Sequence, residues 1–219
     1  MSTRPARGGY GGVLVMILAT YLLALVAENR WLVALLLFVQ TFTVWHLLRV
    51  AGARAGFRLA AGLVFLLALV AAAVNILAQE SPLVGWTFFA ASALYLLAPY
   101  PIVRDLGRRG RVDRQTLLGA LAAYLLIGMS FGFAYECMAV LQPGPLFGSE
   151  GDPGLADALF FSFVTMTTTG YGDLVPDGNP AQSLAVLEAL IGQLFLVTAV
   201  AKVVDNWRPG NWSEPDKAG

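Results

Sequence analysis

The chain has 219 residues, and its 14 Lys and Arg balance 14 Asp and Glu, so the formal net charge is zero. Hydrophobic residues make up 58% of the chain and charged residues only 13%, whereas a soluble domain is nearer half apolar and a quarter charged. This composition excludes an ordinary soluble globule, a disordered chain and a nucleic-acid-binding protein, and it predicts a protein whose solvent is lipid.

Six apolar runs, five of them uncharged, are long enough to cross a membrane as helices. A crossing helix needs about 20 residues, because ~1.5 Å of rise per residue must cover ~30 Å of hydrocarbon. The first run is too long for the core of a signal peptide, so we expect a retained helix. The runs are residues 8–27, 31–48, 59–79, 81–103, 115–135 and 180–201, and the fifth is expected to continue to Leu141.

The basic residues predict how these helices are oriented. If the N-terminus is cytoplasmic and all six helices span, every Lys and Arg except Arg30 lies on the cytoplasmic side. Cytoplasmic loops carry an excess of Lys and Arg in membrane proteins. The sequence therefore predicts an all-α, multi-pass protein of the plasma or inner membrane, with both termini in the cytoplasm.

A segment of mixed character, residues 142–179, lies between the last two runs and so begins and ends on the outer side. Asp152 suits a helix N-cap and Pro153 the first helical position, where its missing N–H costs nothing. The helix predicted at 153–166 would be only ~20 Å long, too short to cross a bilayer, so we expect it to be re-entrant. Non-helical backbone at membrane depth is tolerated only inside protein or along a water-filled path, which predicts a buried or pore-lining extended strand at 168–173.

The sequence after this short helix resembles the T-x-x-T-x-G-Y-G-D selectivity filter of potassium channels, since it reads Thr165-Met166-Thr167-Thr168-Thr169-Gly170-Tyr171-Gly172-Asp173. The resemblance extends over roughly residues 115–208. It implies a pore domain with an outer helix, a pore helix at 153–166, a filter at 168–173 and an inner helix at 180–204. It also implies a potassium-selective channel that conducts K⁺ passively, with no enzymatic step and no organic cofactor beside the K⁺ ions in the filter.

The filter residues have a physical reason for their types. A permeating K⁺ ion exchanges its water shell for protein oxygens, and backbone carbonyls replace that shell if successive ones face the same axis. Ordinary β geometry alternates the carbonyls, so the strand needs the unusual φ and ψ angles that Gly170 and Gly172 tolerate. One chain supplies one strand and a ring of carbonyls needs about four, which predicts a homotetramer. The resemblance implies that K⁺ is bound by the carbonyls of Thr168, Thr169, Gly170 and Tyr171 and by the Thr168 hydroxyl, while the Tyr171 side chain braces the strand.

Glu188 is the only acid within an apolar run, and intramembrane acids are functional candidates. Two interpretations stay open: a protonated or hydrogen-bonded packing residue, or a brace that reaches hydroxyls behind the filter, such as Ser162 or Thr165. Many members of the family place an acid where Val164 stands here, and tryptophans where Phe160 and Phe161 stand, so this chain departs from the pattern of a buried acid pair. The expected filter-supporting residues are Asp173, Thr165, Glu188, Phe160, Phe161 and Val164.

The last run carries two further features. Gly192 lies 19 residues after Asp173 and resembles the hinge glycine of the family's inner helix, although packing of a small residue is an equal alternative. Gln193, Leu196 and Val200 share one helical face and resemble residues that line an inner cavity; the alternative is contact with the fifth helix.

The first four helices match those of six-helix cation channels by count only. Voltage-sensing helices carry Arg at every third position, because charge moving through the field supplies ~2.3 kcal/mol per charge per 100 mV. Residues 81–103 carry no charge, so we expect no gating by an arginine-rich voltage sensor. A basic run follows and suits either a solvated linker or a contact with anionic lipid; it comprises Arg104, Arg108, Arg109, Arg111 and Arg114.

The predicted organisation is a four-helix N-terminal transmembrane domain at 1–103, a basic cytoplasmic linker at 104–114, the pore domain at 115–208 and a short cytoplasmic tail at 209–219. Two other functions stay open, a non-selective cation channel and a non-conducting assembly subunit. An intramembrane aspartyl protease needs a second Asp within a span, and none of the six runs contains an Asp. The single histidine, His46, and the single cysteine, Cys137, are expected to be packing residues, and they exclude a disulfide within the chain and a His-rich metal site.

Overall fold

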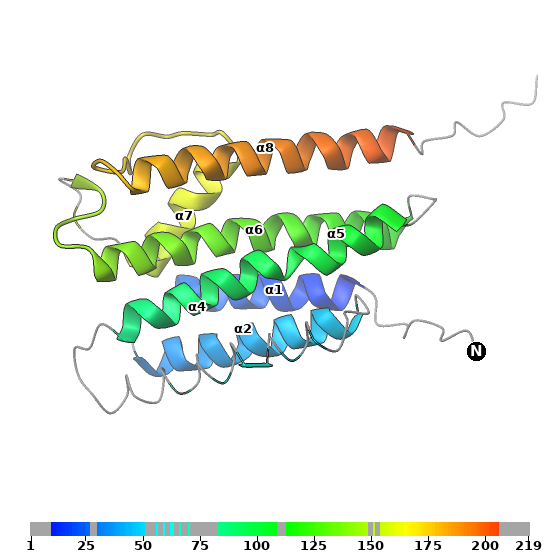
Figure 1. Ribbon diagram of the computed structural model, residues 1–219, viewed down its shortest axis with the longest axis horizontal. Helices are drawn as coiled ribbons and strands as arrows, with labels where there is room; N and C mark the ends of the chain where they lie inside the picture. The colour runs from blue at the N-terminus through cyan, green and yellow to red at the C-terminus, as the bar shows by residue number, and fades with distance from the viewer. Residues whose placement is uncertain are drawn as a thin grey trace, which may run out of the picture.

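The computed structural model describes residues 10–26, 30–50, 83–108, 113–148 and 154–205, together with residues 56, 59, 62–63, 66, 70 and 151. This described part is all-helical, without strands, and its long helices lie side by side (Figure 1). The predicted span at 59–79 falls almost wholly outside the described residues. The helices are α1 (Tyr10–Leu25), α2 (Arg30–Val50), α4 (Leu83–Leu97), α5 (Pro99–Arg108), α6 (Arg114–Leu141), α7 (Leu155–Met166) and α8 (Ala181–Asp205).

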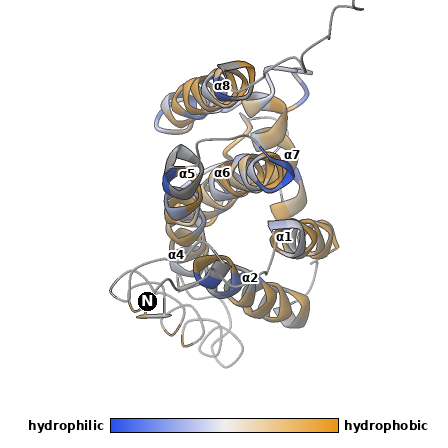
Figure 2. Cartoon of the chain, turned by 90° about the vertical axis from the view of Figure 1, so that its right-hand side faces the viewer, coloured by the Kyte–Doolittle hydropathy of each residue, from blue (hydrophilic) through white to orange (hydrophobic). Residues whose placement is uncertain are grey.

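Three stretches of helix in the described ranges are long and apolar enough to cross a membrane. They are Gly85–Arg104 with 20 residues, Arg114–Leu141 with 28 and Ala181–Lys202 with 22. Apolar colour covers most of the helices (Figure 2), as is expected where the surrounding solvent is lipid. The chain is therefore an integral membrane protein, while the count of six spans stays a prediction.

Helix α6 is the central element of the described fold. Its N-cap, Asp113, accepts a hydrogen bond from the backbone N–H of Thr116 at 2.8 Å, and the Thr116 side chain completes a capping box. The helix ends at Leu141, as the sequence predicts. Helices α1, α4, α5, α7 and α8 all contact it, and Cys137 lies within it as a buried free thiol.

The run at 81–103 was expected to be one helix, and it is divided at Ala98 into α4 and α5. Pro99 starts α5 and has no N–H to donate to the preceding turn, which interrupts the helical ladder at this point. Helix α5 continues to Arg108, so the first part of the predicted basic linker at 104–114 is helical. Arg104 is half-buried there, and Arg109 and Arg111 lie outside the described residues.

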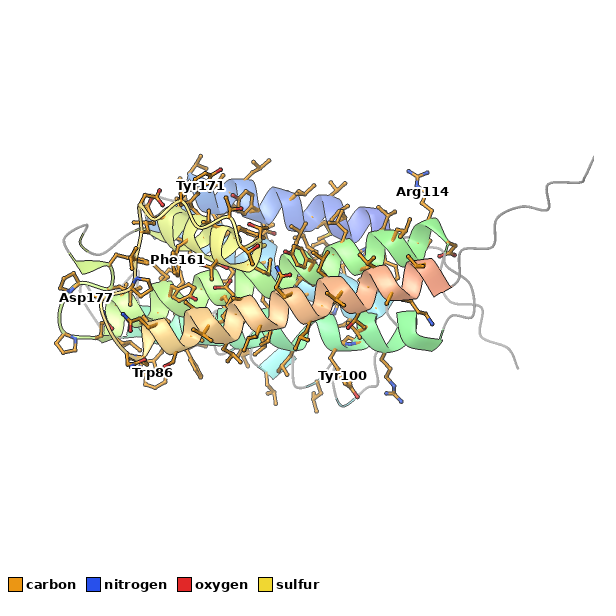
Figure 3. All side chains as sticks on the ribbon, turned by 90° about the horizontal axis from the view of Figure 1, so that it is seen from above. Trp86, Tyr100, Arg114, Phe161, Tyr171 and Asp177 are labelled. Atoms are coloured by element: carbon orange, nitrogen blue, oxygen red, sulfur yellow. The ribbon has the colours of Figure 1, made fainter. Side chains whose placement is uncertain are left out.

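The two ends of the helical array differ in their residues. Trp86, Phe161 and Asp177 lie towards one end, whereas Arg114 lies at the other (Figure 3). The short helix α7, which carries Phe161, therefore lies towards the end opposite Arg114.

Candidate functional site

Helix α7 lies between α6 and α8 and contacts both (Figure 1). It has 12 residues and so spans only ~18 Å, too short to cross hydrocarbon of ~30 Å. Two glycines of α6 allow it to approach closely. A Cβ added at Gly132 would lie 2.5 Å from Cδ2 of Leu159, and one at Gly128 would lie 2.6 Å from Cε1 of Phe163.

The start of α7 differs from the expectation. The helix begins at Leu155, with Gly154 as N-cap in an extended conformation, rather than at Pro153 with Asp152 as cap. Gly154 is accepted at this position because the cap needs only a non-helical backbone and a carbonyl, and that carbonyl accepts the N–H of Ala158 at 3.0 Å. Asp152 and Pro153 themselves lie outside the described residues.

The end of α7 is closed by a Schellman motif. Thr167 is the C-cap, the N–H of Thr168 donates to the carbonyl of Thr165 at 3.0 Å, and the N–H of Thr169 donates to that of Val164 at 2.9 Å. This pattern requires a left-handed residue at the position after the cap. That residue is Thr168, with φ of 57°, although β-branched residues adopt positive φ only when the surroundings impose it.

The segment expected to be extended at 168–173 forms no β-strand, and it has unusual backbone angles at Gly170 and Gly172, as expected. Thr168, Gly170 and Gly172 have positive φ values of 57°, 57° and 82°, while Thr169 and Tyr171 between them do not. A β ladder needs negative φ throughout, so this alternation excludes one. The backbone of this segment thus differs from ordinary β geometry at every second residue.

Glu188 lies behind α7 and is fully buried, with 0% exposure. The hydroxyl of Ser162 donates to its Oε1 at 2.5 Å, and the hydroxyl of Tyr135 donates to its Oε2 at 2.7 Å. Ser162 Oγ also lies 2.6 Å from the carbonyl oxygen of Gly128. The carboxyl group thus joins α6, α7 and α8 through one side chain from each helix.

Of the two hydroxyls named as partners of Glu188, the structure brings only Ser162 to it. Thr165 contributes its backbone carbonyl to the end of α7 instead. Asp173 is exposed, and its Oδ1 accepts the N–H of Leu174 at 3.1 Å. Val164 is half-buried and supplies the other carbonyl that closes α7.

The two phenylalanines of α7 have different surroundings. The ring of Phe160 stacks on that of Tyr171, with centroids 6.0 Å apart and planes inclined by 3°. Phe161 is buried and meets the rings of Tyr135 and Phe147 edge to face, each at 4.9 Å. Phe160 therefore contacts Tyr171 in the segment after α7. Phe161 packs α7 against α6 and against the loop between α6 and α7.

Tyr135 and Phe147 were not identified from the sequence. The signal for Tyr135 was present, because a tyrosine hydroxyl inside an apolar helix needs a partner, and Glu188 is the obvious acceptor in the chain. No pattern in the sequence indicates Phe147. Its role depends on how residues 142–148 fold over α7.

Gly192 is buried against the end of α7. A Cβ at this position would lie 2.5 Å from Cγ of Met166 and 3.1 Å from its carbonyl oxygen. The close approach needs a residue without a side chain. The packing interpretation of Gly192 thus has a definite contact in the structure.

The segment after α7 and much of α8 are exposed in the single chain. Residues Thr167 to Asp173 are all exposed, and between Ala181 and Lys202 only Ala181, Glu188 and Gly192 are buried. Leu196 and Val200 are 45% and 53% exposed, and Gln193 is half-buried. These three residues do not lie mainly against α6.

Comparisons with known proteins place this site in a family. A family model described as ion channel matches residues 120–207. Inward rectifier potassium channel Kirbac3.1 of Paramagnetospirillum magnetotacticum is 39% identical over 80 residues, which cover 36% of this chain and 25% of the relative. Two pore potassium channel b of Oryza sativa subsp. japonica is 40% identical over 86 residues, covering 39% of this chain and 22% of the relative.

A third relative is covered more fully. Protein LctB of Bacillus caldotenax is 31% identical over 103 residues, which cover 44% of this chain and 76% of the relative. By contrast, the chain spans at most a quarter of the length of the two potassium channels above. No solved structure matches the chain.

Proposed function

This chain belongs to the potassium channel family, and we propose that it conducts K⁺ passively and selectively across the membrane as a homotetramer. The observation that carries the proposal is the alternation of positive and negative φ over residues 168–172, directly after a helix too short to span. We propose that this alternation turns the carbonyls of successive residues to one side. Such a row of oxygens is what a dehydrated cation needs.

The proposed K⁺ ligands are the carbonyls of Thr168, Thr169, Gly170 and Tyr171, with the Thr168 hydroxyl. The hydroxyl of Thr169 lies 2.9 Å from that of Thr167, at the end of α7, so this side chain is held against the helix. The C-terminal end of α7 carries a partial negative charge that favours a cation nearby. Gly172 provides the last left-handed residue and lets the chain turn towards Asp173.

The exposed face supports assembly of four chains. A single copy leaves Leu194 at 66%, Val197 at 64% and Tyr171 at 70% exposure along one side of the molecule. Exposed apolar residues of a membrane protein face lipid or another subunit, and the contact of Gly192 in α8 with Met166, just before the filter segment, favours another subunit for this helix. Copies arranged around the filter would bury α8 and bring four rows of carbonyls together, whereas one row alone does not enclose an ion.

The support for the filter comes from behind α7. We assign Glu188, Ser162 and Tyr135 to a brace that fixes α7 between the outer and inner helices, and Gly192 to its inner contact. We further propose cytoplasmic termini, gating without an arginine-rich voltage sensor, and anionic lipid near Arg104, Arg108, Arg109, Arg111 and Arg114.

A flux assay tests the proposal. Purified protein in liposomes loaded with KCl is expected to release K⁺ down its gradient, to pass Rb⁺ but not Na⁺, and to be blocked by Ba²⁺. Equal flux of Na⁺ would indicate a non-selective cation channel instead. Protein that assembles as a tetramer but passes neither ion would indicate a non-conducting subunit.

A further inference from the structure

We infer that each chain's N-terminal helices α1, α4 and α5 pack in the assembled channel against the outer helix α6 of that same chain, and not against a neighbour's. The inference rests on the tetramer proposed above. It decides which filter a movement of the N-terminal helices acts on.

The connection between α5 and α6 is the first observation. Helix α5 ends at Arg108 and α6 begins at Arg114, so five residues join them. An extended chain of this length reaches at most about 20 Å. Packed helices lie ~8–10 Å apart, so the connection reaches the adjacent helix but leaves little length for crossing to another subunit. Short connections of this kind join antiparallel neighbours.

The fit between α4 and α6 is the second observation. Gly85, near the start of α4, lies so close to Leu141, at the end of α6, that an added Cβ would be 2.5 Å from Cγ of the leucine. In the middle of the pair, the hydroxyl of Ser130 donates to the carbonyl of Ser92 at 2.9 Å. The ring of Phe133 stacks on that of Phe88 with centroids 6.5 Å apart. The two helices are thus complementary along most of their length (Figure 1).

Helix α1 reaches from the start of α6 to the pore-side helix. At its first residue, the N–H of Tyr10 donates to Oε1 of Gln115 at 2.8 Å. Near its other end, the ring of Tyr21 meets that of Phe163 in α7 edge to face at 5.5 Å. One helix turn further, the end of α7 gives way to the filter. A shift of α1 therefore acts first on the filter segment of its own chain.

A disulfide experiment on the full chain tests this packing. In a Cys137→Ala background, Gly85→Cys and Leu141→Cys place one thiol on each helix, because the Cγ of Leu141 occupies the position that a cysteine sulfur would take. Cβ atoms about 3.5–4.5 Å apart can form a disulfide. After oxidation with copper phenanthroline, the denatured chain is expected to migrate as a monomer. Neither cysteine is then expected to react with maleimide, because both thiols are in the disulfide.

Chains that carry only one of the two cysteines provide the matched control. When the two single-cysteine chains are co-expressed and oxidised, packing within a chain predicts no disulfide-linked dimer. Packing against a neighbour predicts disulfide-linked dimers in this co-expressed sample. For the double-cysteine chain it predicts linked dimers, trimers and tetramers, seen as a ladder of bands. That ladder would overturn the inference, as would two thiols that stay free in a correctly assembled sample.

A second pair guards against local misfolding at Gly85. Gly11→Cys and Leu118→Cys place one thiol on α1 and one on α6 for a short bifunctional thiol crosslinker, since a Cβ on Gly11 lies 3.7 Å from Cδ1 of Leu118. Light scattering on the same samples separates the two proposals. A tetramer with links between chains contradicts only the packing inference, whereas a particle of fewer than four chains contradicts the proposed function and the tetramer on which the inference rests.

Discussion

Gly192 of the inner helix lies against Met166, the last residue of α7, so closely that a Cβ would come 2.5 Å from the Met166 Cγ and 3.1 Å from its carbonyl oxygen. The contact joins α8 to the point where the filter segment begins. A backbone oxygen cannot move away as the end of a flexible side chain can. Any side chain at Gly192 therefore has to displace the end of α7.

Gly192→Ala is expected to lower the free energy of unfolding by about 1–3 kcal/mol, as overpacking does, and to reduce K⁺ flux. Thermal unfolding in detergent and liposome flux measure the two effects. Met166→Ala added to this variant should restore part of both, because it removes the nearer of the two clashing atoms. Gly12→Ala in α1 is the matched control, since nothing lies within 4 Å of its Cβ. If Gly192→Ala keeps its stability and Met166→Ala does not rescue flux, Gly192 is a hinge and not a packing contact.

Tyr135→Phe should weaken the brace behind α7. The change removes the hydroxyl that donates to Glu188 at 2.7 Å and leaves a buried carboxyl oxygen without this partner, which typically costs about 1–3 kcal/mol. We expect shorter open times in single-channel records, together with a lower melting temperature. Tyr124→Phe on the same helix is the control, because its hydroxyl lies 3.5 Å from the carbonyl oxygen of Met166 and contributes little. Equal effects of the two substitutions would argue against a special role for the Glu188 contacts.

Gly170→Ala is expected to abolish K⁺ flux while the protein still assembles. Nothing lies within 4 Å of an added Cβ, so the penalty comes from the backbone, whose φ is 57°. A left-handed conformation costs an alanine about 1–2 kcal/mol, and a residue that avoids it turns its carbonyl away from the row. Gly154→Ala, at a position with φ of −75°, should conduct like the unchanged chain. Normal selectivity in Gly170→Ala would show that the alternation in this segment is not needed for conduction.

The long helices were the part of this fold that the sequence predicted best. A long apolar run predicts a helix because a segment in lipid must satisfy its backbone hydrogen bonds internally. The run at 115–135, with its continuation to Leu141, is α6 (Arg114–Leu141), and the run at 180–201 corresponds, apart from Pro180, to α8 (Ala181–Asp205). The run at 81–103 corresponds largely to the helical stretch Gly85–Arg104, whose single irregular residue, Ala98, was not predicted. Hydropathy alone does not register that Pro99 removes a hydrogen-bond donor, and the helix divides there.

The geometry of the site was harder to predict from the sequence, because it depends on tertiary contacts. The sequence motif identified the filter residues, but it did not predict the left-handed conformation of Thr168, a residue type that avoids it. That conformation follows from how α7 ends, in hydrogen bonds to the carbonyls of Val164 and Thr165. The position of Glu188 inside an apolar run likewise indicated that it needs a hydrogen-bond partner. Tyr135 of α6 reaches Glu188 of α8 only because the two helices pack together with α7 in the folded chain.

Conduction should depend only weakly on voltage. Helix α4 carries no Lys or Arg, and each charge moved through 100 mV contributes ~2.3 kcal/mol to opening. Recordings in planar bilayers are expected to show that the open probability changes less than about threefold between roughly −100 and +100 mV. A steep curve equivalent to several gating charges per channel would mean that charges elsewhere in the N-terminal helices move through the field.

The reversal potential in a planar bilayer, with KCl on one side and NaCl on the other, tests the central claim most directly. A row of carbonyls that replaces the water shell of K⁺ predicts a potential close to that of a K⁺ electrode, and no K⁺ current through Gly170→Ala. A reversal potential near zero for the unchanged chain, with current present, would contradict the account, because the filter would then not distinguish the two ions.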